Sequence, residues 1–194
     1  MEKKIREKLS GCTVGIGGLG GLGSSIAVLL ARSGIGRLIL ADFDVVDESN
    51  IYRQQYIKTQ IGMKKTDAIR QIIEWIDDRV QVDTFDEKLS GTRACEIFED
   101  ADIVIEAFDN PKSKADMVGA VLKNTGKKIV CASGIAGHGP GDEIVSKKVL
   151  SNLYVVGDGG RGIVEGEKLM ATRVAIAASK QAHLAVRIMI GEEE

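Results

Sequence analysis

The sequence lacks the features that mark secreted or membrane-spanning chains. Its three cysteines, Cys12, Cys95 and Cys131, lie far apart without a Cys-x-x-Cys pair, which favours reduced thiols and a cytoplasmic setting. No run approaches the roughly 18 apolar residues that a membrane span requires. The N-terminal segment is charged and has no apolar core of a signal peptide, so we expect neither a leader nor a membrane partner.

Proline, aromatic residues and net charge are also in short supply. The 194 residues include two prolines and 4% aromatics, and 26 Lys+Arg against 28 Asp+Glu give a formal charge of −2. This balance argues against a polyelectrolyte, so no nucleic-acid partner is expected. The length suits one domain over residues 1–194, with residues 1–10 as an N-terminal arm.

Glycine, in contrast, is abundant. The chain has 23 glycines in 194 residues, about 12% against a usual ~7%. They gather in three segments, 15–23, 134–141 and 157–166. The third segment predicts a mobile loop over residues 157–168.

Short β-rich runs alternate with longer helical ones along most of the chain. The predicted strands are 12–17, 37–41, 80–84, 102–107 and 129–133, and the predicted helices between them are 24–33, 66–79 and 112–123. This alternation predicts an α/β, Rossmann-like, mainly parallel sheet with helices on both faces. A C-terminal β-hairpin (143–149 and 152–156) and a terminal helix (169–190) should follow.

The first glycine segment joins the first predicted strand to the first predicted helix. Gly18, Gly20 and Gly23 satisfy G-x-G-x-x-G, with Gly21 as a further glycine inside it. Such a turn lets backbone N–H groups approach a phosphate at the positive end of a helix. Asp42 ends the second strand about 20 residues downstream, where a carboxylate accepts from ribose hydroxyls. The motif predicts a nucleotide site but does not separate a dinucleotide dehydrogenase from an ATP-binding enzyme.

Polar and charged residues after the strand ends favour ATP. They are Asp44, Asn50, Arg53 and Gln54 after the second strand, Lys65 after Gly62, and Asp109 after the fourth strand. Cleaving a triphosphate requires neutralising the departing pyrophosphate, whereas a dinucleotide needs little such charge. Arg53 would bind phosphate oxygens, Lys65 would act as a movable point charge, and Asp109 would hold Mg²⁺.

Each of these residues also has a plain structural interpretation. Arg53 could form an ion pair, Asp109 could cap the following helix, and Asp44 could simply be solvated. Lys64 and Lys65 are adjacent, so only one should face a nucleotide, and the spacing from Gly62 favours Lys65.

Taken in order, these motifs resemble the ThiF/MoeB/ubiquitin-activating superfamily of ATP-dependent adenylyltransferases over nearly the whole chain. The segments 106–110, 132–137, 154–158 and 169–174 are most similar to the short ThiF proteins of thiamine biosynthesis. The resemblance implies adenylylation of the C-terminal Gly-Gly carboxylate of a ubiquitin-like sulfur carrier protein (ThiS-type), with release of pyrophosphate. It also implies a homodimer that uses ATP and Mg²⁺.

The family's roles fall on specific residues of this sequence. The turn 18–23 would pack against the adenylate and Asp42 would bind the ribose. Asn50, Arg53 and Gln54 would contact phosphates, Lys65 would reach the α/β-phosphate region, and Asp109 would coordinate Mg²⁺.

The sequence also departs from the family pattern. Larger relatives carry two Cys-x-x-Cys pairs for zinc, and this chain has neither, so no structural zinc is expected. Residues 157–168 contain no cysteine, so the chain should stop at the adenylate and leave sulfur insertion to another protein. Lys112 and Lys114 stand where relatives have an arginine, and Arg6 is the candidate for an arginine given across the dimer.

Three other functions remain open at this stage. The enzyme could adenylylate a molybdopterin-type or other sulfur carrier instead of a ThiS-type protein. An NAD-dependent oxidoreductase rests only on G-x-G-x-x-G and Asp42. A nucleotide-dependent module could bind a small β-grasp carrier without activating it.

Overall fold

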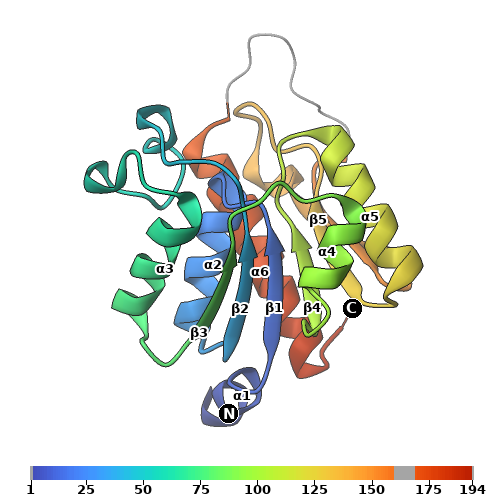
Figure 1. The fold of residues 1–194 in the computed structure, drawn as a ribbon. Helices are drawn as coiled ribbons and strands as arrows, with labels where there is room; N and C mark the ends of the chain where they lie inside the picture. Colours follow the sequence, from blue (N-terminus) through green and yellow to red (C-terminus); the bar gives the residue numbers. More distant parts are fainter. Residues whose placement is uncertain (1, 160–168, 194) are drawn as a thin grey trace.

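A mostly parallel sheet between two layers of helices organises the chain in the computed structural model, which describes residues 2–159 and 169–193 (Figure 1). The strand order is β3-β2-β1-β4-β5-β7-β6, and only β6 runs antiparallel to its neighbour. The strands are β1 (Thr13–Gly17), β2 (Arg37–Ala41), β3 (Gln81–Phe85), β4 (Ile103–Glu106), β5 (Lys128–Ala132), β6 (Val145–Leu150) and β7 (Leu153–Gly157). The predicted loop 157–168 begins at the last residue of β7, and its residues 160–168 lie outside the described residues.

The helices cover both faces of this sheet. They are α1 (Glu2–Leu9), α2 (Gly21–Ser33), α3 (Lys65–Ile76), α4 (Gly91–Ile97), α5 (Pro111–Asn124) and α6 (Ala171–Ile190). Helices α2, α3 and α6 form one layer, and α4 and α5 form the other (Figure 1). The predicted fold class is thereby confirmed, including the hairpin β6–β7 and the terminal helix. None of the described helices is long and apolar enough to cross a membrane.

The alternation of side chains along each strand divides the core into two clusters. In β4, Ile103 and Ile105 pack with α2 and α6, while Val104 packs with α4 and α5. All three side chains are fully buried, because a parallel sheet covered on both faces has no solvent side. Helix α3 buries Ile69 and Ile73 through the period that the sequence predicts.

Several boundaries differ from the sequence-based expectation. Helix α4 was not predicted, because only Ala94 and Ile97 of its short sequence carry buried apolar side chains. Helix α2 begins at Gly21 instead of residue 24, so the glycine motif itself forms its first turn. Cys12 was expected inside a strand, but it precedes β1 and is only half-buried.

The chain order places a topological switch point beside β1. From β1 the chain runs outward through β2 and β3, and it then returns to β4 on the other side of β1. Open α/β sheets bind ligands outside the carboxyl ends of the strands at such a point. Here the turn after Gly17, the loop after Ala41 and the turn after Glu106 meet at this edge.

The predicted N-terminal arm is helix α1, which lies at the opposite edge of the sheet and packs on α6. Lys8 donates from Nζ to the Ile190 carbonyl at 2.9 Å. Arg6 lies against Gly34, just past the end of α2. A 13-residue helix is about 20 Å long, so Arg6 is far from the glycine turn of its own chain.

We predict that Glu193 stabilises the fold near neutral pH. Its carboxylate forms an ion pair with Lys128 and accepts from the Tyr154 hydroxyl at 2.8 Å. Together with a contact to Lys148, these interactions lower the pKa of Glu193 from 4.5 to about 2. A depressed folded-state pKa stabilises the fold above the unfolded value and loses that effect as the pH falls toward 2. Glu193→Gln should therefore reduce the free energy of unfolding near neutral pH, with a difference that vanishes on acidification.

Urea unfolding of the wild type and the variant over this pH range measures the effect. Glu192→Gln is the matched control, because Glu192 is mostly exposed and its ion pair with Arg187 is long, at 4.0 Å. A difference between wild type and Glu193→Gln that does not change with pH would contradict the prediction.

Candidate nucleotide-binding site

The turn between β1 and α2 is built by the close approach of its own backbone. A Cβ atom on Gly23 would lie 1.8 Å from the Gly18 carbonyl oxygen, so no other residue fits there. Gly18 has φ +92°, and a Cβ there would lie 2.9 Å from the Ala107 oxygen. Helix α2 has no side-chain cap at Gly20. No capping side chain from the described residues therefore occupies its first N–H groups, which can bind a phosphate.

Asp42 holds this turn in place. Its carboxylate accepts from the Leu19 amide at 2.6 Å and from the Asp44 amide at 2.8 Å. The side chain is buried, and this burial raises the pKa of Asp42, while Lys65 and the two amides oppose the rise. One carboxylate therefore joins the end of β2 to the glycine turn. A ribose would compete for oxygens that already accept backbone hydrogen bonds.

Lys65 is the buried member of the lysine pair. Its side chain is only 6% exposed, and its Nζ lies 2.7 Å from a carboxylate oxygen of Asp44. Lys64 is 55% exposed and pairs with Asp86 at the surface. The structure therefore buries Lys65, and not Lys64, beside the loop that follows β2.

Arg53, Gln54 and Asn50 come from the segment between β2 and α3. The Arg53 carbonyl and side chain lie against Gly21, and the Arg53 guanidinium donates to the Ser49 carbonyl at 2.9 Å. The Gln54 amide lies near Gly20, and its Oε1 is buried without a partner among the described residues.

Asn50 is buried and closes a turn instead of facing the glycine turn. Its Oδ1 accepts from the Asp47 amide at 3.1 Å. Arg53 and Gln54 thus meet the glycine turn directly, and Asn50 supports the loop that carries them.

Asp109 lies in the short connection between β4 and α5. It is exposed, and its carboxylate makes no hydrogen bond or ion pair with any described residue. The alternative interpretation as a helix cap is wrong, because Asn110 caps α5 and accepts from the amides of Lys112 and Ser113. The nearby Ala107 carbonyl contacts Gly18, which joins the Asp109 connection to the glycine turn.

The described residues contain no cluster of three or more His, Cys, Asp or Glu that could hold a metal alone. A lone exposed carboxylate at a strand end still fits Mg²⁺. This ion usually takes one or two carboxylates and completes its shell with substrate phosphates and water.

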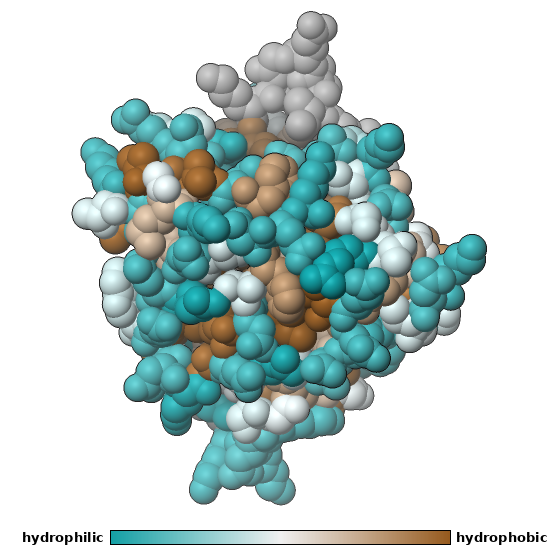
Figure 2. Space-filling model, viewed as in Figure 1, coloured by the Kyte–Doolittle hydropathy of each residue, from teal (hydrophilic) through white to brown (hydrophobic). Residues whose placement is uncertain are grey.

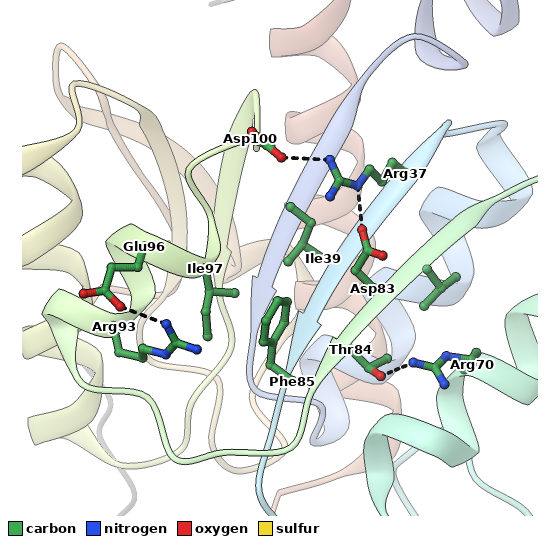
Figure 3. Close-up of a pocket in the computed structure, with 11 residues that line it drawn as sticks. Arg37, Ile39, Arg70, Asp83, Thr84, Phe85, Arg93, Glu96, Ile97 and Asp100 are labelled. Atoms are coloured by element: carbon green, nitrogen blue, oxygen red, sulfur yellow. Dashed lines mark hydrogen bonds and ion pairs between the residues drawn. The ribbon is translucent and has the colours of Figure 1, made fainter.

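A separate cavity of about 510 Å³ lies on the α4 face of β2 and β3 (Figure 3). Two of its three arginines form ion pairs: Arg37 pairs with Asp83 and Asp100, and Arg93 pairs with Glu87 and Glu96, whereas Arg70 donates to the Thr84 hydroxyl. The ion pairs neutralise two of the three guanidinium charges that would attract a phosphate. No residue of the glycine turn lines the cavity, so we do not assign the nucleotide to it.

Two buried ion pairs near this edge were not assigned a role from the sequence. Glu106, at the end of β4, is fully buried and pairs with Lys114. Arg173, in the first turn of α6, pairs with Asp158 at 2.7 Å and donates to the Gly139 and Pro140 carbonyls. An acid at the end of an otherwise apolar strand was the one available signal for Glu106.

Comparison with known proteins relates the chain to adenylyltransferases. It is 34% identical over 133 residues to the adenylyltransferase and sulfurtransferase UBA4 of Kluyveromyces lactis, covering 68% of this chain and 30% of that protein. The Candida glabrata protein of the same name is 35% identical over 123 residues, covering 63% and 28%. The matched part is thus about a third of the length of these curated relatives.

Solved structures share the fold at lower identity. The Escherichia coli tRNA N6-threonylcarbamoyladenosine dehydratase TcdA in complex with ATP has a TM-score of 0.89 at 19% identity, covering 98% of this chain and 90% of that chain. E. coli MccB with ATP has a TM-score of 0.77 at 22% identity, covering 98% and 59%. The model of the ThiF family matches residues 1–194. The protein therefore belongs to the ThiF family.

Proposed function

We propose that this protein adenylylates the C-terminal Gly-Gly carboxylate of a ubiquitin-like sulfur carrier protein, using ATP and releasing pyrophosphate. The observation that carries the proposal is the buried Lys65, held by Asp44 beside a glycine turn at the switch point of the sheet. A dehydrogenase has no need of a buried cation there. Phosphoryl and nucleotidyl transfer depend on such charge.

The reaction needs alignment and charge neutralisation but no protein nucleophile. A carboxylate oxygen of the carrier attacks the α-phosphorus, and the bond from that phosphorus to the bridging oxygen of the pyrophosphate breaks. The amides at the start of α2 and the Arg53 guanidinium bind phosphate oxygens. When ATP binds, the Lys65 ammonium would leave Asp44 and pair with the triphosphate. The triphosphate carries more negative charge, so it attracts the ammonium more strongly than one half-exposed carboxylate does.

Asp109 would hold Mg²⁺ on the phosphates. When bound, the ion neutralises negative charge on the phosphate oxygens as pyrophosphate departs. The Asp42 carboxylate would hold the glycine turn through the Leu19 amide, and the same carboxylate would also accept a hydrogen bond from a ribose hydroxyl. Gln54 would complete the polar wall of the site, and Asn50 would support the loop that carries it.

The carrier that we propose is of the ThiS type, in the thiazole branch of thiamine biosynthesis, and the reaction would take place in the cytoplasm. The motifs 106–110 and 154–158 support this choice, because they are most similar to the short ThiF proteins. The curated relatives named above are adenylyltransferase and sulfurtransferase proteins, which favours another sulfur carrier as the second candidate. A chain without cysteine in residues 157–168 would leave the sulfur step to a separate protein.

We also propose that the protein is a homodimer. Exposed apolar side chains gather beside the nucleotide site, in the segment between β2 and α3 (Figure 2). They are Phe43, Val45, Tyr52, Ile57 and Ile61, which we call the loop patch. A second copy would cover the loop patch, and it is also the only source of an Arg6 near the site, because Arg6 lies at the far end of α2 in its own chain.

Mass spectrometry of candidate carriers incubated with the protein and Mg-ATP tests the activity. We expect a mass gain of one AMP on a carrier that ends in Gly-Gly. Lys65→Met should reduce the initial rate by about 100-fold or more, the usual effect of removing one charge-stabilising group from a transition state. Lys64→Met is the matched control and should keep the wild-type rate, because Lys64 pairs with Asp86 at the surface.

No AMP transfer to any Gly-Gly carrier would overturn the proposed function. Equal losses in the two lysine variants would show that Lys65 has no special place in the site. Transfer to a molybdopterin-type carrier alone would replace the thiamine assignment with the second candidate.

Replacing Asp109 should affect magnesium-dependent binding and leave the fold unchanged. Its carboxylate contacts no other described residue, so Asp109→Asn should keep the wild-type melting temperature. Calorimetry should show weaker ATP affinity in Mg²⁺ and unchanged affinity in EDTA. Asp78→Asn, exposed at the far end of α3, serves as the control. A variant that binds Mg-ATP as tightly as the wild type would rule out Asp109 as the metal ligand.

Light scattering tests the dimer. We expect a dimer at micromolar concentration, and Tyr52→Glu should give a monomer, because this 77% exposed side chain lies in the loop patch. Trp75→Glu is the control, because Trp75 is 70% exposed but lies ten residues along α3 from Lys65. This spacing puts it about 15 Å from the end of α3 that adjoins the loop patch. A monomeric wild type, or dissociation by both variants alike, would contradict the proposed interface.

A further inference from the structure

Glu106 is a fully buried acid at the edge of the sheet where the nucleotide site lies. It is the last residue of β4, it pairs in register with Gly17 of β1, and its side chain has no exposed surface. The three residues before it in β4 are all apolar. Burying a carboxylate is costly unless it is paired and hydrogen-bonded. The partners of Glu106 therefore indicate what the carboxylate does.

Two partners of the Glu106 carboxylate lie on either side of Asp109 in the sequence, Phe108 before it and Lys114 in the first turns of α5, and the Ala132 backbone at the end of β5 is a third partner. Oε1 accepts from the Phe108 amide at 2.6 Å, and Oε2 pairs with the Lys114 ammonium from the first turns of α5. Burial raises the pKa of Glu106, and Lys114 opposes the rise. One side chain thus joins the start of the connection to the helix that ends it.

Asp109 is the residue that this closed turn leaves free. Phe108 before it is fixed by Glu106, and Asn110 after it is fixed as the cap of α5 at 3.0 Å from the Lys112 and Ser113 amides. The Asp109 carboxylate bonds to none of the described residues. Hydrogen bonds therefore hold the chain on both sides of Asp109, and the exposed Asp109 carboxylate is left available.

The two lysines that follow Asp109, Lys112 and Lys114, differ in the same way: one is paired with a described residue and the other is not. Lys114 is 26% exposed and is occupied by Glu106. Without Glu106, its ammonium would be an unpaired cation in the same turn as Asp109 and would compete with a metal for that carboxylate. Lys112 is exposed and forms no ion pair with a described residue, so it needs no such restraint.

We propose that Glu106 is the positioning residue of the metal side of the site: by binding the Phe108 amide and the Lys114 ammonium, it orients Asp109 and keeps that carboxylate free for Mg²⁺ on the nucleotide. This inference rests on the proposed function, because it assigns Asp109 to a metal-bound ATP. It also resolves which of the two lysines after Asp109 has a defined place. Lys114 is held against Glu106, and Lys112 is solvated.

The test measures ATP affinity by calorimetry in Mg²⁺ and in EDTA, with no carrier present. Glu106→Gln keeps the size of the side chain and an acceptor for Phe108, but it releases Lys114. It should weaken Mg-ATP binding by about 10- to 100-fold, the usual effect of losing a group that orients a metal ligand, and leave the EDTA value unchanged. In an Asp109→Asn background, the same substitution should cause no further loss, because Glu106 acts through Asp109.

Two further variants separate positioning from folding. Lys123→Met, an exposed lysine in the last turn of α5, is the matched control and should keep both affinities. The pair Glu106→Gln with Lys114→Met removes both buried charges together, so it should fold even where Glu106→Gln alone does not. It should bind Mg-ATP more tightly than Glu106→Gln, since the competing ammonium is gone.

Equal loss of affinity in Mg²⁺ and EDTA, or a further loss in the Asp109→Asn background, would overturn the positioning role. So would a Glu106→Gln variant with wild-type affinities. Failure of the proposed function gives a different result: the wild type binds Mg-ATP but transfers AMP to no carrier. In that case the ratio of the two affinities still decides the role of Glu106. A wild type that does not bind ATP would overturn both proposals.

Discussion

The site depends on how closely the backbone approaches itself between β1 and α2. A Cβ atom at Gly23 would lie 1.8 Å from the Gly18 carbonyl oxygen, which leaves room only for hydrogen. This contact lets α2 begin at Gly21, directly after β1. In the described part of the chain, no capping side chain occupies the first backbone amides of α2. Asp42 secures the turn from β2 through the Leu19 amide, and the Ala107 carbonyl covers it from β4. Three neighbouring strands therefore determine one small surface.

The charged side chains around this surface differ in how deeply they are buried and in whether they are paired. Lys65 is buried and paired with the half-exposed Asp44, and in our proposal its ammonium leaves that carboxylate for the triphosphate. Glu106 and Lys114 form a more buried pair, and their role in our proposal is to hold the backbone around Asp109. Asp109 has no partner among the described residues. A formal net charge of −2 is thus compatible with the polyanion site that we propose, because charges elsewhere, such as those of Arg37 and Arg93, are paired with carboxylates.

Much of the fold was predictable because it follows from local patterns. The alternation of strands and helices, the hairpin and the terminal helix were all predicted, and the structure confirms them. Helix α4 was missed because a seven-residue helix with two buried apolar side chains has no period to detect. The start of α2 was placed three residues late, since glycine is a poor helix former and only the packing of the turn makes it helical here.

The sequence by itself determined the family and the glycine turn, and it predicted which residues would serve a triphosphate, because motif spacing and strand order are local properties of the chain. Only the tertiary structure decided how those residues are used. It buried Lys65 and exposed Lys64, made Asn110 and not Asp109 the cap of α5, and placed Arg6 at the wrong end of α2 to serve its own chain. It also joined Glu106 to Lys114 across a turn. These outcomes depend on which side chains the packed layers leave room for, and no single segment contains that information.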